Sequence, residues 1–121
     1  MLIAFWIVTA LTAIAFLGAG GMKVVRPVPA LREAGMGWVD DFTIPTVKLI
    51  AIAEVIGAFG LVLPPLTGIA PILSPIAAVC LAIIMAGAVV VHVRRKEAPA
   101  PAVVLTLLPI ASAILGFAVF A

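Results

Sequence analysis

The sequence predicts an all-α integral membrane protein: a bundle of four transmembrane helices. Over 121 residues it is 66% hydrophobic and 10% charged, whereas soluble domains carry roughly 25% charged residues. The apolar residues fall in four blocks, and each reaches the ~17–25 residues that a helix needs to cross a hydrocarbon core ~30 Å thick. The apolar/polar alternation of barrel strands is missing from these blocks. We expect one domain over residues 1–121, with helices at about 2–21, 44–63, 70–93 and 100–120.

The first predicted helix, residues 2–21, is expected to be retained rather than cleaved as a signal peptide. Such peptides begin with a positively charged segment, but here the first cation, Lys23, follows the apolar run. Glycines at 18, 20 and 21 indicate the end of the helix. Residues 23–43 then form a short interfacial segment, with Trp38 at the level of the lipid head groups.

The second helix contains the most informative residue, Glu54, near the centre of an apolar span. A carboxylate at the bilayer midplane costs at least ~2.5–3.5 kcal/mol unless it is protonated, paired or facing a polar cavity. Small residues at 51, 57 and 58 share its helical face and permit close approach of another helix. Glu54 therefore marks a candidate site. Lys48, nearer the helix start, either serves that site or extends to the membrane boundary, as lysines near helix ends do.

The third helix, 70–93, presents a face that ends at His92. A rise of ~1.5 Å per residue places Thr12, Met85 and residues 106–109 at about the depth of Glu54. Pro109 also frees the backbone carbonyl of Leu105, which can accept a hydrogen bond from a protonated Glu54. We predict a pocket that opens to the charged side. Its candidate ligand-binding or proton-handling residues are Glu54, His92, Lys48, Thr12 and Met85. The alternative is that Glu54 is a hydrogen-bonded packing residue and His92 an interfacial anchor.

Charge placement predicts the orientation. All seven Lys and Arg residues lie on the side of the first and third connections, while the side with the termini and the turn at 64–69 has no charged side chain. The positive-inside rule places both charged connections in the cytoplasm and both termini outside. Nucleic-acid binding is not expected, because no basic face lies on a soluble domain. Five basic residues are expected to contact lipid head groups: Lys23, Arg26, Arg94, Arg95 and Lys96.

Several kinds of chemistry find no support in the sequence. Cys80 stands alone in the third helix, where we expect a buried packing residue and no internal disulfide. The single histidine has no second strong ligand at metal spacing, so no metal site is predicted. No Ser/His/Asp set or phosphate-binding glycine loop is present. The residues leave open whether the protein is an enzyme.

Three groups of residues resemble a known family. They are Lys23 after the first helix, Lys48-x5-Glu54-x2-Gly57 leading to Leu63-Pro64, and Met85-x-Gly87-Ala88-x3-His92-x-Arg94. Over residues 15–96 the chain resembles the DoxX-like family of small bacterial membrane proteins with four helices.

This resemblance implies a multi-pass protein of the bacterial cytoplasmic (inner) membrane. The resemblance indicates Glu54 and His92 as site residues, with Lys48 and Lys23 as secondary candidates. It implies no reaction that members of the family share. Relatives in the wider superfamily include a subunit of a thiosulfate:quinone oxidoreductase and a component of a membrane-linked oxidative-stress complex.

Two functions of different classes remain open. The first is a non-enzymatic accessory module that binds a hydrophobic small molecule or a partner membrane protein around Glu54 and His92. The second is a redox subunit with a quinone as cofactor, in which those residues exchange protons and a partner supplies electrons; histidine suits such exchange at physiological pH. A homo-oligomer is also expected, from small residues that permit close helix packing: Gly57, Gly60, Ala111, Ala113 and Gly116.

Overall fold

The structure is a computed structural model that describes residues 1–25, 44–96 and 100–121. These residues form four helices: α1 (Leu2–Val25), α3 (Ile44–Thr67), α4 (Leu73–Arg94) and α5 (Ala100–Phe120). Each is long and apolar enough to cross a membrane. The predicted fold class is therefore confirmed. The interfacial segment predicted between the first two helices falls almost wholly on residues 26–43, outside the described residues.

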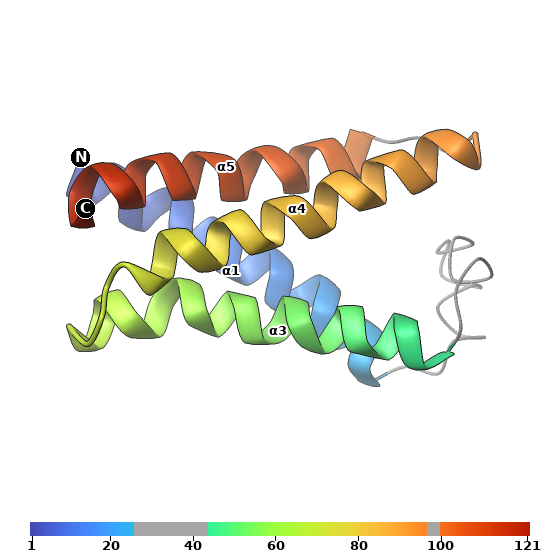
Figure 1. The fold of residues 1–121 in the computed structure, drawn as a ribbon, viewed down its shortest axis with the longest axis horizontal. Coiled ribbons are helices and arrows are strands. Elements are labelled where there is room, and N and C mark those ends of the chain that lie inside the picture. Colours follow the sequence, from blue (N-terminus) through green and yellow to red (C-terminus); the bar gives the residue numbers. More distant parts are fainter. Residues whose placement is uncertain (26–43, 97–99) are drawn as a thin grey trace.

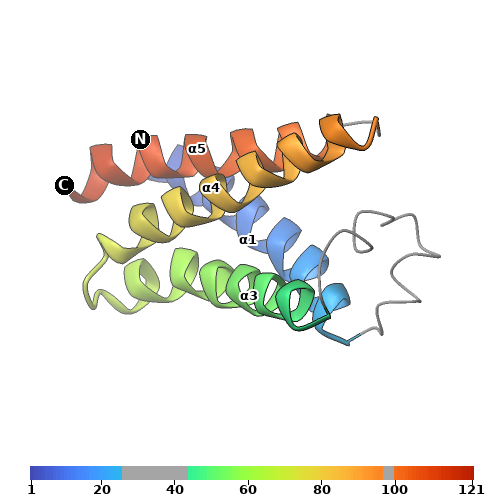
Figure 2. The ribbon, with the colours of Figure 1, turned by 45° about the vertical axis from the view of Figure 1, so that its right-hand side comes forward.

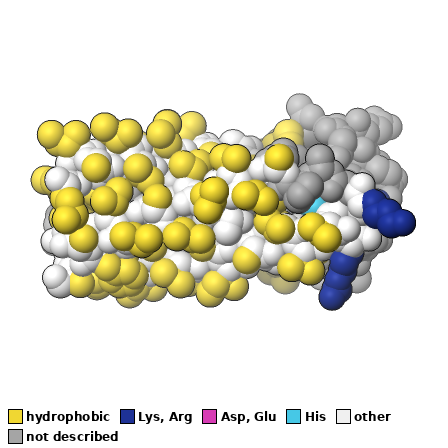
Figure 3. All heavy atoms as spheres, turned by 90° about the horizontal axis from the view of Figure 1, so that it is seen from above, with side chains coloured by type: hydrophobic (Ala, Val, Ile, Leu, Met, Phe, Trp, Pro, Cys, Tyr) yellow, Lys and Arg dark blue, Asp and Glu magenta, His cyan; other side chains and the backbone are white. Residues whose placement is uncertain are grey.

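The helices run up and down in chain order, and each packs against two others. α1 packs against α3 and α5, and α4 packs against α3 and α5. Both termini and the α3–α4 turn lie at one end of the bundle, which we call the terminus end (Figures 1 and 2). At the opposite end, the charged end, Lys and Arg side chains gather, while hydrophobic side chains cover most of the visible face (Figure 3).

The interior is a compact apolar cluster to which all four helices contribute. Large side chains alternate with alanines, which lets the helices approach closely. Leucine and isoleucine side chains also cover the outer faces of every helix, as expected where lipid is the solvent. The buried cluster consists of Ala13, Phe16, Ala58, Leu61, Ala78, Leu81, Met85 and Ala113.

α1 continues one turn beyond its predicted end and stops at Val25. One of the glycines that we took as the end of this helix, Gly20, instead lies within it and packs against α3. A Cβ atom on Gly20 would lie 3.0 Å from the Glu54 Cβ and 3.1 Å from the Ala51 carbonyl oxygen, so any larger residue would require α3 to move by a few tenths of an ångström. Lys48 then donates hydrogen bonds to the carbonyls of Lys23 and Val24. These carbonyls have no helical donor at a C-terminus, and a cation there also suits the helix dipole.

α3 also extends past its predicted end, through Pro64 and Pro65 to Thr67. Neither proline has an N–H group, so Pro65 leaves the carbonyl of Leu61 without its usual helical donor. The Ser74 hydroxyl of α4 donates to that carbonyl at 2.6 Å. A side chain from the next helix thus replaces the lost backbone bond, as is common for proline inside membrane helices.

Small residues expected to mediate association between chains are used within this chain. Added Cβ atoms on Gly57 and Gly116 would lie 2.7 Å from Leu81 and 3.0 Å from Pro75, both in α4. A Cβ on Gly60 would lie 3.3 Å from Ala77. Association between copies would therefore use other surfaces.

Candidate functional site

Glu54 is fully buried and forms an ion pair with Lys23 across the α1–α3 interface. The Lys23 ammonium donates to both carboxylate oxygens, at 2.8 Å to Oε1 and 3.1 Å to Oε2. Lys23 is itself buried. A buried carboxylate without a partner would be strongly unfavourable, and an ammonium that reaches both oxygens offsets much of that cost.

Lys23 therefore does not lie where the sequence analysis placed it. We expected it to contact lipid head groups beside Arg26, but its ammonium is turned inward and buried against Glu54. The extra helical turn after Gly21 places the lysine on the face of α1 that meets α3. Arg26 lies outside the described residues.

His92 lies in the last turn of α4 and faces the interior. It follows Met85 by seven residues, so the two share one side of the helix, and Met85 is buried in the core cluster. The His92 Nδ1 atom is buried and has no hydrogen-bond partner in the described part of the chain. Leaving a buried polar atom unpaired costs on the order of 1–3 kcal/mol. Among the described residues, the hydrogen-bonding capacity of this nitrogen is therefore unused.

The structure brings together some predicted site residues and separates others. Lys48 joins the Glu54–Lys23 pair through the Lys23 carbonyl. Thr12 instead donates to the Val8 carbonyl of its own helix at 2.7 Å. The residues of α1 that contact Glu54 are Gly20 and Lys23, two to three turns nearer the charged end than Thr12. No hydrogen bond or ion pair joins Glu54 to His92 within residues 1–25, 44–96 and 100–121.

The remaining predictions concern the surface. Arg94 and Lys96 are exposed at the charged end, while Arg95 is partly buried. Cys80, expected to be buried, is exposed on α4. Among the described residues, no group of three or more His, Cys, Asp or Glu side chains could hold a metal ion.

Sequence reasoning missed the pairing of Lys23 with Glu54. Our depth estimate assumed a first helix ending near residue 21, which left Lys23 outside the membrane. One signal was available: Lys23 lies three residues after Gly20, which places both on one face of a continued helix.

Four apolar spans that enclose a buried ion pair define a small multi-pass membrane protein with a polar centre inside the bundle. The model of the DoxX-like family matches residues 7–115, and the chain belongs to that family. No curated protein and no solved structure matches the chain.

Proposed function

We propose that this protein is a non-enzymatic accessory module of the membrane. In this proposal it binds a hydrophobic small molecule that carries a hydrogen-bonding head group, at the charged end between Glu54 and His92. The observation that carries the proposal is the buried and unpartnered Nδ1 of His92. A head group that donates to or accepts from this nitrogen would remove the cost of leaving it unpaired.

The ion pair supports a binding role over a chemical one. Lys23 already contacts both oxygens of Glu54, so the carboxylate serves the packing of α1 on α3. In this arrangement His92 contacts the head group, and the Glu54–Lys23 pair fixes the opposite side of the bundle. The proposal also places the charged end in the cytoplasm and the terminus end outside the cytoplasmic membrane of a bacterium, following the positive-inside rule.

The test is native mass spectrometry of the detergent-purified protein, with extraction and identification of any bound molecule. We would compare wild type with His92→Phe, which keeps a planar ring and removes both nitrogens. Lys96→Gln is the matched control, because it changes an exposed residue of the same end. We expect a small molecule in wild type and Lys96→Gln, and its loss in His92→Phe.

Two other outcomes would favour a different function, and a third would refute the proposed site. Wild-type protein without any small molecule, but with a co-purifying membrane protein that His92→Phe loses, would favour partner binding. A recovered quinone would favour the redox subunit, and quinone-dependent respiration in cells that lack the protein would then be measured. An equal small-molecule content in wild type and His92→Phe would refute a site at His92.

A further inference from the structure

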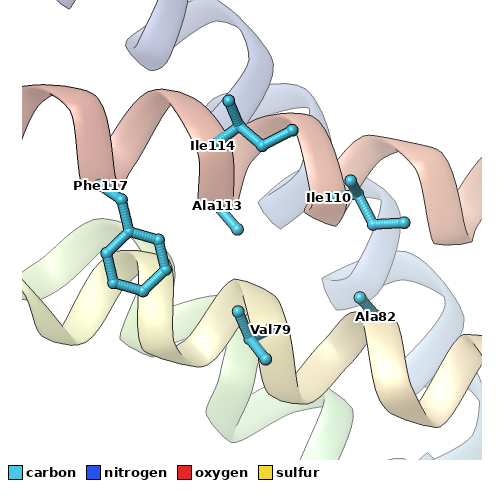
Figure 4. Close-up of a pocket in the computed structure, with 6 residues that line it drawn as sticks. All are labelled: Val79, Ala82, Ile110, Ala113, Ile114 and Phe117. Carbon is cyan, nitrogen blue, oxygen red and sulfur yellow. The ribbon is translucent and has the colours of Figure 1, made fainter.

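A hollow of about 330 Å³ opens between α4 and α5, away from the Glu54–His92 region. Val79 and Ala82 of α4 face Ile110, Ala113 and Phe117 of α5 across it (Figure 4). Ile114 completes the lining, and none of the six side chains has a polar atom. Ala82 and Ala113 leave the space that larger side chains would fill.

The hollow lies at the depth of hydrocarbon. At ~1.5 Å per residue, Val79 and Ala82 lie ~9 and ~14 Å from the start of α4, which is at the terminus end. The corresponding distances for Phe117 and Ile110, from the end of α5, are ~5 and ~15 Å. The deepest of these positions is about half-way through a hydrocarbon core ~30 Å thick. The hollow is therefore within reach of one leaflet, the one at the terminus end.

The interface that forms the hollow differs from the other three. α1 is tied to α3 by the ion pair, α3 to α4 by the Ser74 hydroxyl, and α1 to α5 by the Thr9–Ser112 hydrogen bond of 2.7 Å. No side-chain hydrogen bond links the described residues of α4 and α5. In its described part this interface is held by apolar contacts, so a hydrocarbon group can enter it there without displacing a polar partner.

The size of the hollow selects its occupant. Its lining presents only carbon atoms, so the occupant is a hydrocarbon group. A methylene group occupies about the volume of a water molecule, ~30 Å³, so on the order of ten methylene groups fit.

We infer that this hollow, the α4–α5 site, holds one acyl chain of a phospholipid from the leaflet at the terminus end. Recognition depends on the chain and not on the head group, because the described residues of the terminus end carry no charged side chain. The site is separate from the one proposed at His92 and does not depend on it.

The experiment measures phospholipid retention by native mass spectrometry after reconstitution and detergent extraction. Wild type is compared with Ala82→Phe, which fills the hollow, and with Ala53→Phe, which adds the same side chain to an exposed position of α3. We expect one phospholipid per chain in wild type and Ala53→Phe, and about tenfold less in Ala82→Phe. Phosphatidylcholine and phosphatidylglycerol with the same long chains should be retained equally, and short-chain analogues should be lost.

A second variant covers the case in which Ala82→Phe does not fold. Ile114→Trp enlarges a side chain at the mouth of the hollow, where Ile114 is 64% exposed, and it should lower retention in the same way. Equal retention in wild type and in both variants would overturn the inference. So would retention of phosphatidylglycerol alone, or a dimer that Ala82→Phe dissociates. Retention in His92→Phe should match wild type, which separates this site from the proposed function.

Discussion

At the scale of single residues, the ion pair with Lys23 changes the role that we assign to the Glu54 carboxylate. In the sequence it is an isolated acidic group in an apolar span, which favours a ligand site or a proton-handling site. In the structure, Lys23 contacts both of its oxygens and Gly20 admits the backbone of α1 beside it. Glu54 is therefore first of all the anchor of the α1–α3 interface.

Removing one member of this pair should destabilise the protein more than removing both. Lys23→Met leaves Glu54 buried without its partner, and the expected cost is about 3–5 kcal/mol. Replacing the pair by apolar residues, in Lys23→Met/Glu54→Leu, should recover most of that loss. Thermal unfolding in detergent micelles would measure both. A double variant no more stable than Lys23→Met would show that the pair itself contributes the stability.

The glycines of α1 offer a matched comparison. Gly20→Ala places a Cβ 3.1 Å from the backbone oxygen of Ala51, so α3 must move by a few tenths of an ångström, at an expected cost of about 1–3 kcal/mol. Gly21→Ala meets nothing within 4 Å and should gain up to about 1 kcal/mol from helix propensity. Unfolding midpoints of the two variants would shift in opposite directions. A shift in the same direction would contradict the close contact at Gly20.

At the scale of elements, the helix spans could be predicted and their ends could not. Lipid requires that each backbone polar group be paired within the spanning segment, so a long apolar run implies a helix. The ends depend on tertiary partners instead. α1 passes Gly21 because Lys23 pairs with Glu54 and Lys48 caps the final carbonyls. α3 passes Pro65 because Ser74 satisfies the Leu61 carbonyl.

That last contact predicts an interaction between two substitutions. Ser74→Ala should cost about 0.6 kcal/mol, with ~1.7 as the upper range for hydrogen bonds between membrane helices. In a Pro65→Ala background the residue at 65 has its own N–H group for Leu61, so Ser74→Ala should cost much less there. A double-mutant cycle of unfolding free energies gives the coupling. Additive costs would show that Ser74 does not replace the lost backbone bond.

At the scale of the whole molecule, the arrangement of four spans follows from chain order and charge. Both termini and the α3–α4 turn share one end, as the alternation of the spans requires (Figure 1). The site was less predictable. Composition identified Glu54 as a site residue, and helical periodicity placed His92 on an inward face. The role of Lys23 depended on where α1 ends, and the glycines had led us to end the helix before this lysine.

Cysteine labelling should report the orientation. In a Cys80→Ser background, Ile69→Cys lies in the exposed turn of the terminus end and Lys96→Cys at the exposed charged end. A membrane-impermeant maleimide added to intact bacterial spheroplasts should label position 69, and position 96 only after lysis. The reverse pattern would mean that the positive-inside rule fails for this protein.

The ion pair also has a consequence for biosynthesis. Glu54 belongs to α3 and Lys23 to α1, and each charge alone would enter hydrocarbon at a cost of at least a few kcal/mol. These helices, which follow each other among those that the structure describes, therefore hold opposite charges that cancel only when they enter side by side. We expect α1 and α3 to insert into the membrane together, as a helical hairpin, because neither charge is paired until both helices are present.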